Sequence, residues 1–180
     1  MARLIFIGGG ARSGKSAAAV ARAKSFSPPR VFLATAAPSD EEMRTRIALH
    51  KKERGLSFET MEVPLELAAA IEGRSDASVI VIDCLTLWLS NLLLEQRTDE
   101  EIMHATEAWI EAAQQHPGTI VVVANEVGQG LVPMDALSRR FRDAAGRVNQ
   151  RVAAAAHEVE LRYFGLGLTL KNDASLGEEP

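Results

Sequence analysis

The stretch Gly9-Gly10-Ala11-Arg12-Ser13-Gly14-Lys15-Ser16 is the clearest indication of the fold of this chain. It matches the pattern G-x-x-x-x-G-K-[ST], follows a short apolar run at 4–7 and opens an alanine-rich run at 17–23. A strand, a glycine-rich loop and a helix in this order form a phosphate cradle, because the backbone N–H groups converge on one anion at the positive end of the helix. In such a loop Lys15 reaches the β- and γ-phosphates, and the Ser16 hydroxyl binds Mg²⁺. The stretch therefore predicts a protein that binds a nucleoside triphosphate.

The composition is that of an ordinary soluble globular protein, with 47% hydrophobic and 24% charged residues. The 180 residues are enough for one well-buried domain and few for two. A formal net charge of −4 argues against an extended nucleic-acid surface. The single cysteine, Cys84, excludes an internal disulfide and suits a reducing compartment. Because Cys84 lies inside an apolar run, we expect it to be a small buried side chain rather than a nucleophile.

No segment has the pattern of a targeting sequence or a membrane anchor. The N-terminal apolar run ends in glycines and is too short for the core of a signal peptide. The longest apolar stretch, 79–94, contains Asp83, Thr86, Ser90 and Asn91, and it is shorter than a membrane span. We therefore expect a cytoplasmic protein without a membrane span.

Strand and helix signals alternate along the chain. Ser39 with Glu42 and Thr98 with Glu101 form capping boxes, and Pro64 suits the first residue of a helix. The expected strands are 4–7, 31–34, 58–63, 78–82, 119–124, 159–163 and 166–170, and the expected helices are 17–24, 39–54, 65–71, 85–94, 98–115 and 135–156, the last with Gly146 as its weak point.

Strands that alternate with helices imply an open α/β sheet, mostly parallel and covered by helices on both faces, here with antiparallel strands at its C-terminal end. No internal repeat or low-complexity linker divides the chain. We therefore expect a single domain over 1–171 and a loose polar tail over 172–180.

In an open α/β sheet, ligands bind outside the carboxyl ends of the strands. Asp83 follows the strand 78–82 and suits the acid that holds Mg²⁺ directly or through water, although an acid there also serves turns and caps. The strand 119–124 is followed by 125–130, Asn-Glu-Val-Gly-Gln-Gly, which suits either a substrate loop or a solvated turn.

The expected helix 39–54 carries a basic face. Arg46, His50 and Arg54 follow one another at successive helical turns, and Lys51 and Lys52 lie beside them. A lone histidine on a basic helix is usually a solvated bystander. A neutral imidazole is also a nucleophile, and next to a phosphate held by arginines His50 would be able to attack phosphorus.

The other histidines and a second basic cluster carry less information. His104, His116 and His157 have no metal-site spacing, so we expect surface or internally satisfied side chains. The second cluster consists of Arg139, Arg140, Arg142 and Arg147. It suits either a solvated helix face, with an Arg139–Asp143 pair, or a phosphate or acceptor clamp.

Several motifs in fixed order resemble one known family. They are 9–16, Ala34-Thr35-Ala36, Glu-Met-Arg-Thr-Arg-Ile-Ala-Leu-His at 42–50, Asp-Cys-Leu-Thr-Leu-Trp-Leu-Ser-Asn-Leu-Leu at 83–93, Asn-Glu-Val-Gly at 125–128, Phe-Arg-Asp at 141–143 and Gly-Arg-Val-Asn-Gln at 146–150. Over nearly all of residues 3–171 the chain resembles the bifunctional adenosylcobinamide kinase/adenosylcobinamide-phosphate guanylyltransferases of cobalamin biosynthesis. The combination is far more specific than the phosphate loop alone.

The resemblance implies two reactions on a RecA-like P-loop fold assembled as a homotrimer. One moves the γ-phosphoryl group of ATP or GTP to the aminopropanol hydroxyl of adenosylcobinamide. In the other a histidine, matched by His50, attacks the α-phosphate of GTP, releases pyrophosphate and passes GMP to adenosylcobinamide phosphate, giving adenosylcobinamide-GDP. Lys15 is then catalytic beside His50, and Ser16 and Asp83 hold Mg²⁺. The implied nucleotide-binding residues are Gly9, Gly10, Ala11, Arg12, Ser13, Gly14, Lys15, Ser16, Ala34, Thr35, Ala36, Lys51, Lys52, Glu53, Arg54, Glu62 and Asp83.

Two other functions fit the phosphate loop. A simple P-loop kinase for a small molecule would lack the nucleotidyl step, and His50 discriminates it from the bifunctional enzyme. A GTP-dependent switch would need a partner protein, and the absence of an N-K-x-D sequence counts against it.

Overall fold

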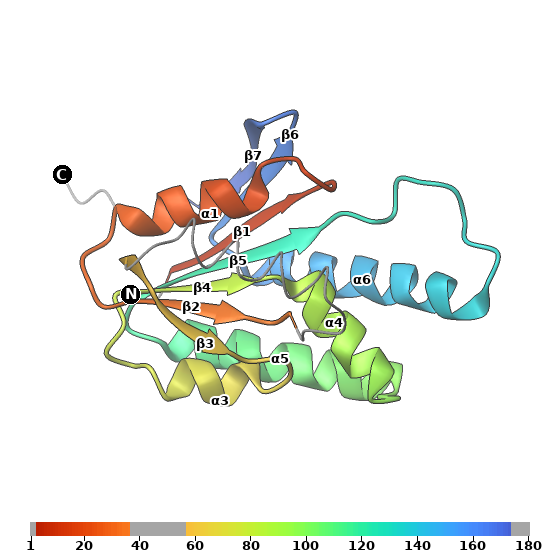
Figure 1. The fold of residues 1–180 in the computed structure, drawn as a ribbon, viewed down its shortest axis with the longest axis horizontal. Coiled ribbons are helices and arrows are strands. Elements are labelled where there is room, and N and C mark those ends of the chain that lie inside the picture. Colours follow the sequence, from red (N-terminus) through yellow and green to blue (C-terminus); the bar gives the residue numbers. More distant parts are fainter. Residues whose placement is uncertain (1–2, 37–56, 174–180) are drawn as a thin grey trace.

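The computed structural model describes residues 3–36 and 57–173 of the chain. Within them the chain forms a seven-stranded sheet flanked by helices (Figure 1). The strands are β1 (Arg3–Gly9), β2 (Arg30–Ala34), β3 (Glu59–Glu62), β4 (Val79–Asp83), β5 (Thr119–Asn125), β6 (Glu158–Tyr163) and β7 (Leu166–Asn172). The helices are α1 (Lys15–Lys24), α3 (Leu67–Glu72), α4 (Leu85–Leu94), α5 (Asp99–Gln115) and α6 (Ala136–Ala155).

The strand order is β3-β2-β4-β5-β1-β6-β7. Neighbouring strands are parallel from β3 to β6, and β7 returns antiparallel to β6 as a hairpin. The prediction of a mostly parallel α/β sheet is thus confirmed. Its antiparallel part is the single edge strand β7, since β6 itself runs parallel to β1.

The register aligns the carboxyl ends of the parallel strands along one edge of the sheet, the edge that runs across the strands. Ala34, the last residue of β2, lies opposite both Glu62 of β3 and Asp83 of β4. Gly9, the last residue of β1, lies opposite Asn125 of β5. The segments that the sequence singled out after separate strands therefore start from a common edge.

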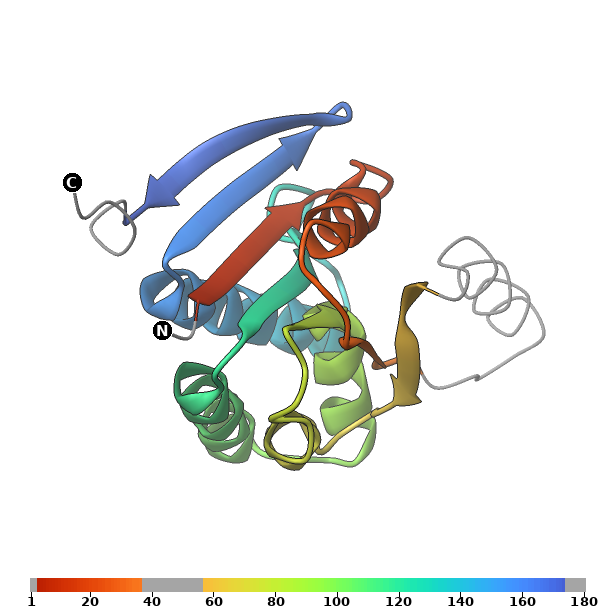
Figure 2. The ribbon, with the colours of Figure 1, turned by 90° about the vertical axis from the view of Figure 1, so that its left-hand side faces the viewer.

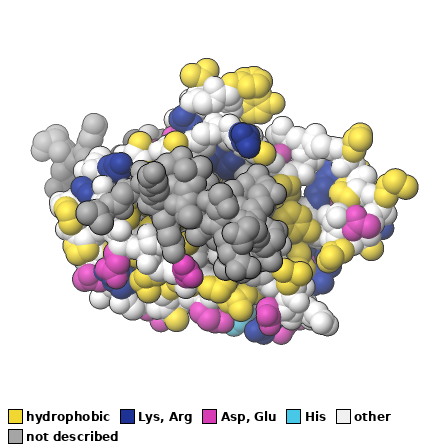
Figure 3. All heavy atoms as spheres, viewed as in Figure 1, with side chains coloured by type: hydrophobic (Ala, Val, Ile, Leu, Met, Phe, Trp, Pro, Cys, Tyr) yellow, Lys and Arg dark blue, Asp and Glu magenta, His cyan; other side chains and the backbone are white. Residues whose placement is uncertain are grey.

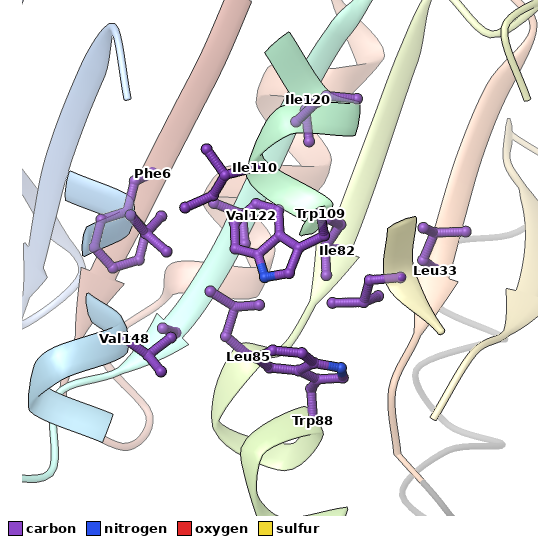
Figure 4. Close-up of a cluster of buried hydrophobic side chains, with 14 of the residues drawn as sticks. Phe6, Leu33, Ile82, Leu85, Trp88, Trp109, Ile110, Ile120, Val122 and Val148 are labelled. Atoms are coloured by element: carbon purple, nitrogen blue, oxygen red, sulfur yellow. The ribbon is translucent and has the colours of Figure 1, made fainter. Parts of the chain in front are cut away.

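Alternate residues of the strands point to opposite faces of the sheet and belong to two separate hydrophobic clusters. On one face of the sheet, Ile7 belongs to a cluster with Ala19, whose small side chain lets α1 approach the strands closely. On the other face, Phe6 joins the larger cluster with Trp88 of α4 and Trp109 of α5 (Figure 4). Figure 2 shows α1 on one side of the sheet and α3, α4, α5 and α6 on the other. Truncating either fully buried tryptophan to alanine would cost about 3–5 kcal/mol.

Most of the predicted helix boundaries are confirmed. Helix α4 covers the predicted 85–94, and α5 begins with the predicted capping box. In that box the Thr98 hydroxyl accepts from the Glu101 N–H at 3.2 Å, and the Glu101 carboxylate accepts from the Thr98 N–H at 2.7 Å. Asp135 caps α6 by accepting from the Ser138 N–H at 2.8 Å, and the helix continues through Gly146.

The predicted start of the helix after β3 is wrong. Helix α3 begins at Leu67 rather than directly after Pro64, because α4 side chains use the preceding carbonyls. Trp88 Nε1 donates to the Leu65 carbonyl at 2.7 Å, and Asn91 Nδ2 donates to the Pro64 carbonyl at 3.0 Å.

The predicted helix 39–54 lies outside the described residues. Of the predicted loose tail 172–180, the structure describes only Asn172, which is the last residue of β7, and Asp173, whose N–H donates to the His157 carbonyl at 2.8 Å. Among the helices that the structure describes, none has both the length and the apolar character needed to cross a membrane.

Candidate active site

The stretch 9–16 forms a loop between β1 and α1. Gly14, the residue before α1, has φ +92°, a conformation that favours glycine, and no side chain caps the helix. The N–H groups of the first turn therefore remain directed toward the loop, where an anion would be stabilised by them and by the helix dipole. The local structure is the phosphate cradle that the sequence predicts.

Lys15 points back into this loop. Its side chain is buried, with Nζ donating to the Gly10 carbonyl at 2.6 Å and lying 3.4 Å from Ser13 Oγ. Burial lowers the pKa of the Lys15 ammonium, while nearby Cys84 and Asp83 oppose that shift. The ammonium is thus poorly solvated without a ligand, and a bound phosphate would supply the negative charge that it lacks.

Ser16 and Asp83 meet beside the loop. Ser16 Oγ donates to Asp83 Oδ1 at 3.4 Å, although β4 and β1 are separated in the sheet by β5. A hydroxyl and a carboxylate are ligands that Mg²⁺ accepts together with water and nucleotide phosphates. The described residues contain no group of three His, Cys, Asp or Glu side chains able to hold a metal ion.

The segment after β2 is tied to the end of β4. Thr35 is fully buried, and its hydroxyl donates to the Cys84 carbonyl and accepts from the Cys84 N–H, both at 2.8 Å. Asn91 Nδ2 donates to the Thr35 carbonyl at 2.8 Å. Ala34, which pairs with Asp83 in the sheet, and Thr35 are therefore held in place relative to Asp83. The buried position of Cys84 confirms its prediction, and burial, with the Asp83 carboxylate, raises the pKa of its thiol to about 11.

The loop after β5 is anchored at its base. Asn125 N–H donates to Thr86 Oγ1 at 2.7 Å, and Asn149 Nδ2 donates to the Asn125 carbonyl at 3.2 Å. Arg142 donates to the Gly128 carbonyl at 2.7 Å. The Glu126 N–H donates to the Gly9 carbonyl at 3.0 Å, which places Glu126 directly beside the phosphate loop.

The turn of the β6–β7 hairpin also rests on the phosphate loop. Gly165 N–H donates to the Ser13 carbonyl at 3.2 Å, and Arg162 lies opposite Gly9 in the β1–β6 ladder. A cavity of about 190 Å³ lies between the hairpin, the phosphate loop and the loop after β5. It is lined by Gly10, Glu126, Val127, Gln129, Gly130, Leu161 and Tyr163. Sequence reasoning missed Leu161 and Tyr163, since their only signal was strand alternation.

The second basic cluster has mainly structural partners. Arg140 and Arg147 both pair with Asp99 at the start of α5. Arg139 donates to the Pro133 and Met134 carbonyls rather than to Asp143. With Arg142 on Gly128, these arginines fix α6 and the loop after β5, and none of these contacts is that of a phosphate clamp.

The histidines in the described residues behave as predicted. His116 is buried, with Nε2 at 2.9 Å from the Arg74 carbonyl and Nδ1 accepting from the Gly118 N–H at 3.0 Å. His157 Nδ1 accepts from the Leu4 N–H at 3.0 Å, and His104 is exposed.

The sequence-predicted nucleotide site divides into two parts. The phosphate loop, Ala34–Ala36, Glu62 and Asp83 lie along the common edge of the sheet. The remaining predicted residues lie outside the described part of the chain, namely His50, Lys51, Lys52, Glu53 and Arg54.

Two solved structures with a similar fold illustrate the match. The flagellar accessory protein FlaH from Methanocaldococcus jannaschii matches with a TM-score of 0.57 at 14% identity, covering 99% of this chain and 82% of FlaH. A second solved structure, described as an ATPase domain, matches with a TM-score of 0.55 at 12% identity, covering 96% of this chain and 78% of that domain. These similarities support the fold and carry no further information on substrates.

Sequence comparison is more specific. Residues 5–170 match the family model described as cobinamide kinase / cobinamide phosphate guanyltransferase. The bifunctional adenosylcobalamin biosynthesis protein CobP of Pseudomonas aeruginosa is 42% identical over 169 residues, covering 92% of this chain and 95% of CobP. The protein of the same description named CobU, from Salmonella typhimurium, is 38% identical over 185 residues, covering 93% of this chain and 99% of CobU. With a phosphate loop, a Ser16–Asp83 pair and this match over most of its length, the chain belongs to the cobinamide kinase / cobinamide phosphate guanyltransferase family.

Proposed function

We propose that this protein is a bifunctional enzyme of adenosylcobalamin biosynthesis. It phosphorylates adenosylcobinamide with ATP or GTP, and it transfers GMP from GTP to adenosylcobinamide phosphate, giving adenosylcobinamide-GDP and pyrophosphate. The observation that carries the proposal is Lys15 buried inside a phosphate loop beside the Ser16–Asp83 pair, in a chain that matches this family over residues 5–170.

In the kinase step, the alcohol oxygen of adenosylcobinamide attacks the γ-phosphorus and the bond to the β,γ-bridging oxygen breaks. Lys15 and the loop N–H groups bind the β- and γ-phosphates, so positive charge lies where negative charge accumulates on the leaving nucleotide. Ser16 and Asp83 are the residues that would hold Mg²⁺, which supplies charge neutralisation on the phosphates when bound.

In the guanylyl step, an imidazole nitrogen of His50 attacks the α-phosphorus of GTP and pyrophosphate leaves. A phosphate oxygen of adenosylcobinamide phosphate then attacks the same phosphorus, and the P–N bond breaks. The phosphate loop suits pyrophosphate as a leaving group, since it binds the two phosphates that depart. Lys51, Lys52, Glu53 and Arg54, next to His50 in the sequence, are proposed to contact the nucleotide with Ala34–Ala36 and Glu62.

The proposed assembly is a homotrimer acting in the cytoplasm. The edge strand β7 supports an assembly, because Leu166, Leu168 and Leu170 are exposed by 74%, 59% and 59%. Light scattering of the purified protein measures the number of subunits, and Leu168→Glu is expected to reduce it. A monomeric wild-type protein would contradict this part of the proposal.

Labelling tests the nucleotidyl step and separates it from a simple kinase. Incubation with GTP labelled at the α-phosphate should leave acid-labile, base-stable label on the protein, as expected for a phosphoramidate. His50→Asn should abolish the label, and His104→Asn, which changes an exposed histidine of α5, should retain it. Equal labelling of the His50→Asn protein would reject the covalent role of His50.

Acceptor dependence tests the kinase step. Release of ADP should depend on adenosylcobinamide and give phosphorylated product in equal amount. Turnover that is unaffected by adenosylcobinamide would instead favour a nucleotide switch.

A further inference from the structure

Of the described residues that are proposed to bind the nucleotide, only Gly10 lines the cavity beside the phosphate loop. We propose that this cavity receives the alcohol-bearing arm of the kinase acceptor, and that the Glu126 carboxylate accepts the hydrogen bond and then the proton of that alcohol. This inference rests on the proposed function and assigns the acceptor side of its first reaction.

The position of the cavity fits the end of the nucleotide that reacts. Gly10 forms part of the cavity wall, and its carbonyl accepts from Lys15 Nζ at 2.6 Å. Because the lysine of a phosphate loop reaches the β- and γ-phosphates, the wall at Gly10 lies beside the terminal phosphates rather than the base. An alcohol in the cavity would therefore approach the γ-phosphorus from outside the loop.

Glu126 is held so that its carboxylate keeps acceptor capacity. Its two oxygens accept from the Gly128 N–H at 2.6 Å and the Gln129 N–H at 3.2 Å. Two carboxylate oxygens offer about four acceptor positions, so these bonds orient the group and leave room for an alcohol. The anchors at Asn125 and Gly128 hold the same loop from outside.

The charge of Glu126 selects the kind of ligand. A carboxylate in the wall repels a phosphate, which excludes the nucleotide's own phosphates from the cavity. A neutral alcohol is attracted as a hydrogen-bond donor. The same repulsion acts on the phosphorylated product, so the arm is expected to leave the cavity once it has reacted.

The size of the cavity and its rim indicate a large acceptor. At about 190 Å³ the cavity is below the usual range for sites that enclose a whole ligand, about 300–1,000 Å³.

The rim of the cavity is formed by exposed side chains of two segments. Leu131 and Met134, in the segment that continues from the cavity wall, are 97% and 98% exposed. On the hairpin, Tyr163 packs edge-to-face on the exposed Phe164 with ring centroids 4.5 Å apart. Figure 3 shows hydrophobic side chains projecting over both segments. An acceptor with a bulky, partly apolar body outside the cavity and one alcohol arm inside it matches these surfaces.

The chemical step balances within this arrangement. The alcohol oxygen forms a bond to the γ-phosphorus, the bond from that phosphorus to the bridging oxygen breaks, and the nucleoside diphosphate leaves with that electron pair. The alcohol proton passes to Glu126 and then to solvent.

The first test is Glu126→Gln, which keeps one acceptor oxygen for the shorter bond from the Gly128 N–H, gives up the longer bond from the Gln129 N–H and removes the base. We expect kcat for acceptor phosphorylation to fall about a hundredfold or more with little change in the acceptor KM. Guanylylation of the protein by GTP should be unchanged. The matched control is Glu72→Gln, an exposed glutamate at the end of α3, which should behave as wild type.

Three results would overturn the assignment of Glu126. A variant with wild-type kcat overturns it, and so does a raised acceptor KM with unchanged kcat, which would reduce Glu126 to a loop support. Equal loss of guanylylation would place Glu126 with the nucleotide. A wild-type protein that phosphorylates no corrinoid would instead overturn the proposed function, and this inference with it.

The second test concerns the rim. Leu131→Ser combined with Met134→Ser should raise the KM for adenosylcobinamide about tenfold, as expected for losing contact with two apolar side chains. Phosphorylation of free aminopropanol, which lacks the bulky body, should proceed equally in variant and wild type. Leu94→Ser, at the exposed end of α4 and outside the segments that line the cavity, is the control. An unchanged KM for adenosylcobinamide in the double variant would overturn the role of the rim.

Discussion

Replacing Gly9 by alanine should both destabilise the fold and disable the phosphate loop. Gly9 has φ +150°, and a Cβ added to it would lie 2.4 Å from the Arg162 carbonyl oxygen and 2.8 Å from Ser13 Oγ. Arg162 is the residue opposite Gly9 in the β1–β6 ladder, so the nearer clash is with the backbone of a neighbouring strand. Neither the strand nor the loop can relieve it without moving the other.

The size of the effect follows from two terms. A side chain in this backbone conformation costs about 1–3 kcal/mol. Forcing an extra carbon against packed backbone costs about 1–3 kcal/mol more. We therefore expect the free energy of unfolding to fall by about 4 kcal/mol, which at about 2–4 °C per kcal/mol for a domain of this length lowers Tm by about 8–16 °C.

Differential scanning calorimetry with a matched glycine separates this effect from the general consequences of a Gly→Ala change. Gly146 lies inside α6 with no atom within 4 Å of an added Cβ. Gly146→Ala restricts the unfolded chain as Gly9→Ala does, and it should stabilise the protein by about 0.5–1 kcal/mol because alanine favours the helix. If Gly9→Ala melts within 2 °C of wild type, or binds ATP normally, the close approach of β6 to the phosphate loop does not constrain residue 9.

Three further predictions concern two buried side chains and one helix cap. Because burial lowers the pKa of Lys15, its charge destabilises the unliganded fold. This cost is complete below the lowered pKa, where both states hold the proton, and it shrinks as pH rises toward the ordinary value of 10.5, since the folded state loses the proton first. Near pH 7 and without ligand, Lys15→Met should therefore be at least as stable as wild type, and the difference in free energy of unfolding should decrease at alkaline pH. The variant should also lose the rise in Tm that MgATP produces in wild type. A lower Tm for the unliganded variant than for unliganded wild type would contradict this. With its pKa raised from 9.0 to about 11, Cys84 should react with iodoacetamide at pH 8 about a hundredfold more slowly in the folded protein than after denaturation, and equal rates would refute its burial. Thr98→Ala removes one half of the α5 capping box and should cost about 1 kcal/mol in urea unfolding, with an unchanged midpoint as the contrary result.

The sequence allowed the phosphate loop and the order of elements to be predicted because both are local. The pattern 9–16 needs no distant partner, and caps such as Thr98 with Glu101 are complete within one helical turn. The error at Pro64 has the opposite origin. The Pro64 carbonyl accepts from Asn91 and the Leu65 carbonyl accepts from Trp88. Both donors lie more than 20 residues away in the sequence, so no local pattern predicts these hydrogen bonds.

The cavity was missed for the same reason. Tyr163 and Glu126 line one cavity only because β6 and β5 lie on opposite sides of β1, an arrangement set by pairings between residues far apart in sequence. The sequence predicts the loop 125–130 to be a substrate loop or a solvated turn. Only the structure shows that side chains of β6 lie across from this loop and form a cavity with it. Alternation along β6 shows that one face is half-exposed, but it does not show which strand lies beside it.

The placement of two carboxylates explains how one phosphate loop can serve two reactions in sequence. Asp83 lies against Ser16, where the phosphates and a metal ion are proposed to bind, and Glu126 lies in the wall of the cavity beside Gly10. On the assignment made above, Glu126 attracts the acceptor as an alcohol and repels it as a phosphate, so phosphorylation itself weakens binding in the cavity. The product must then return in a different orientation for the guanylyl step, whose electrophile is the α-phosphorus rather than the γ-phosphorus. Glu126→Gln should therefore retain the phosphorylated product more tightly than wild type while transferring GMP to it at the normal rate, a combination that a general loosening of the loop would not produce.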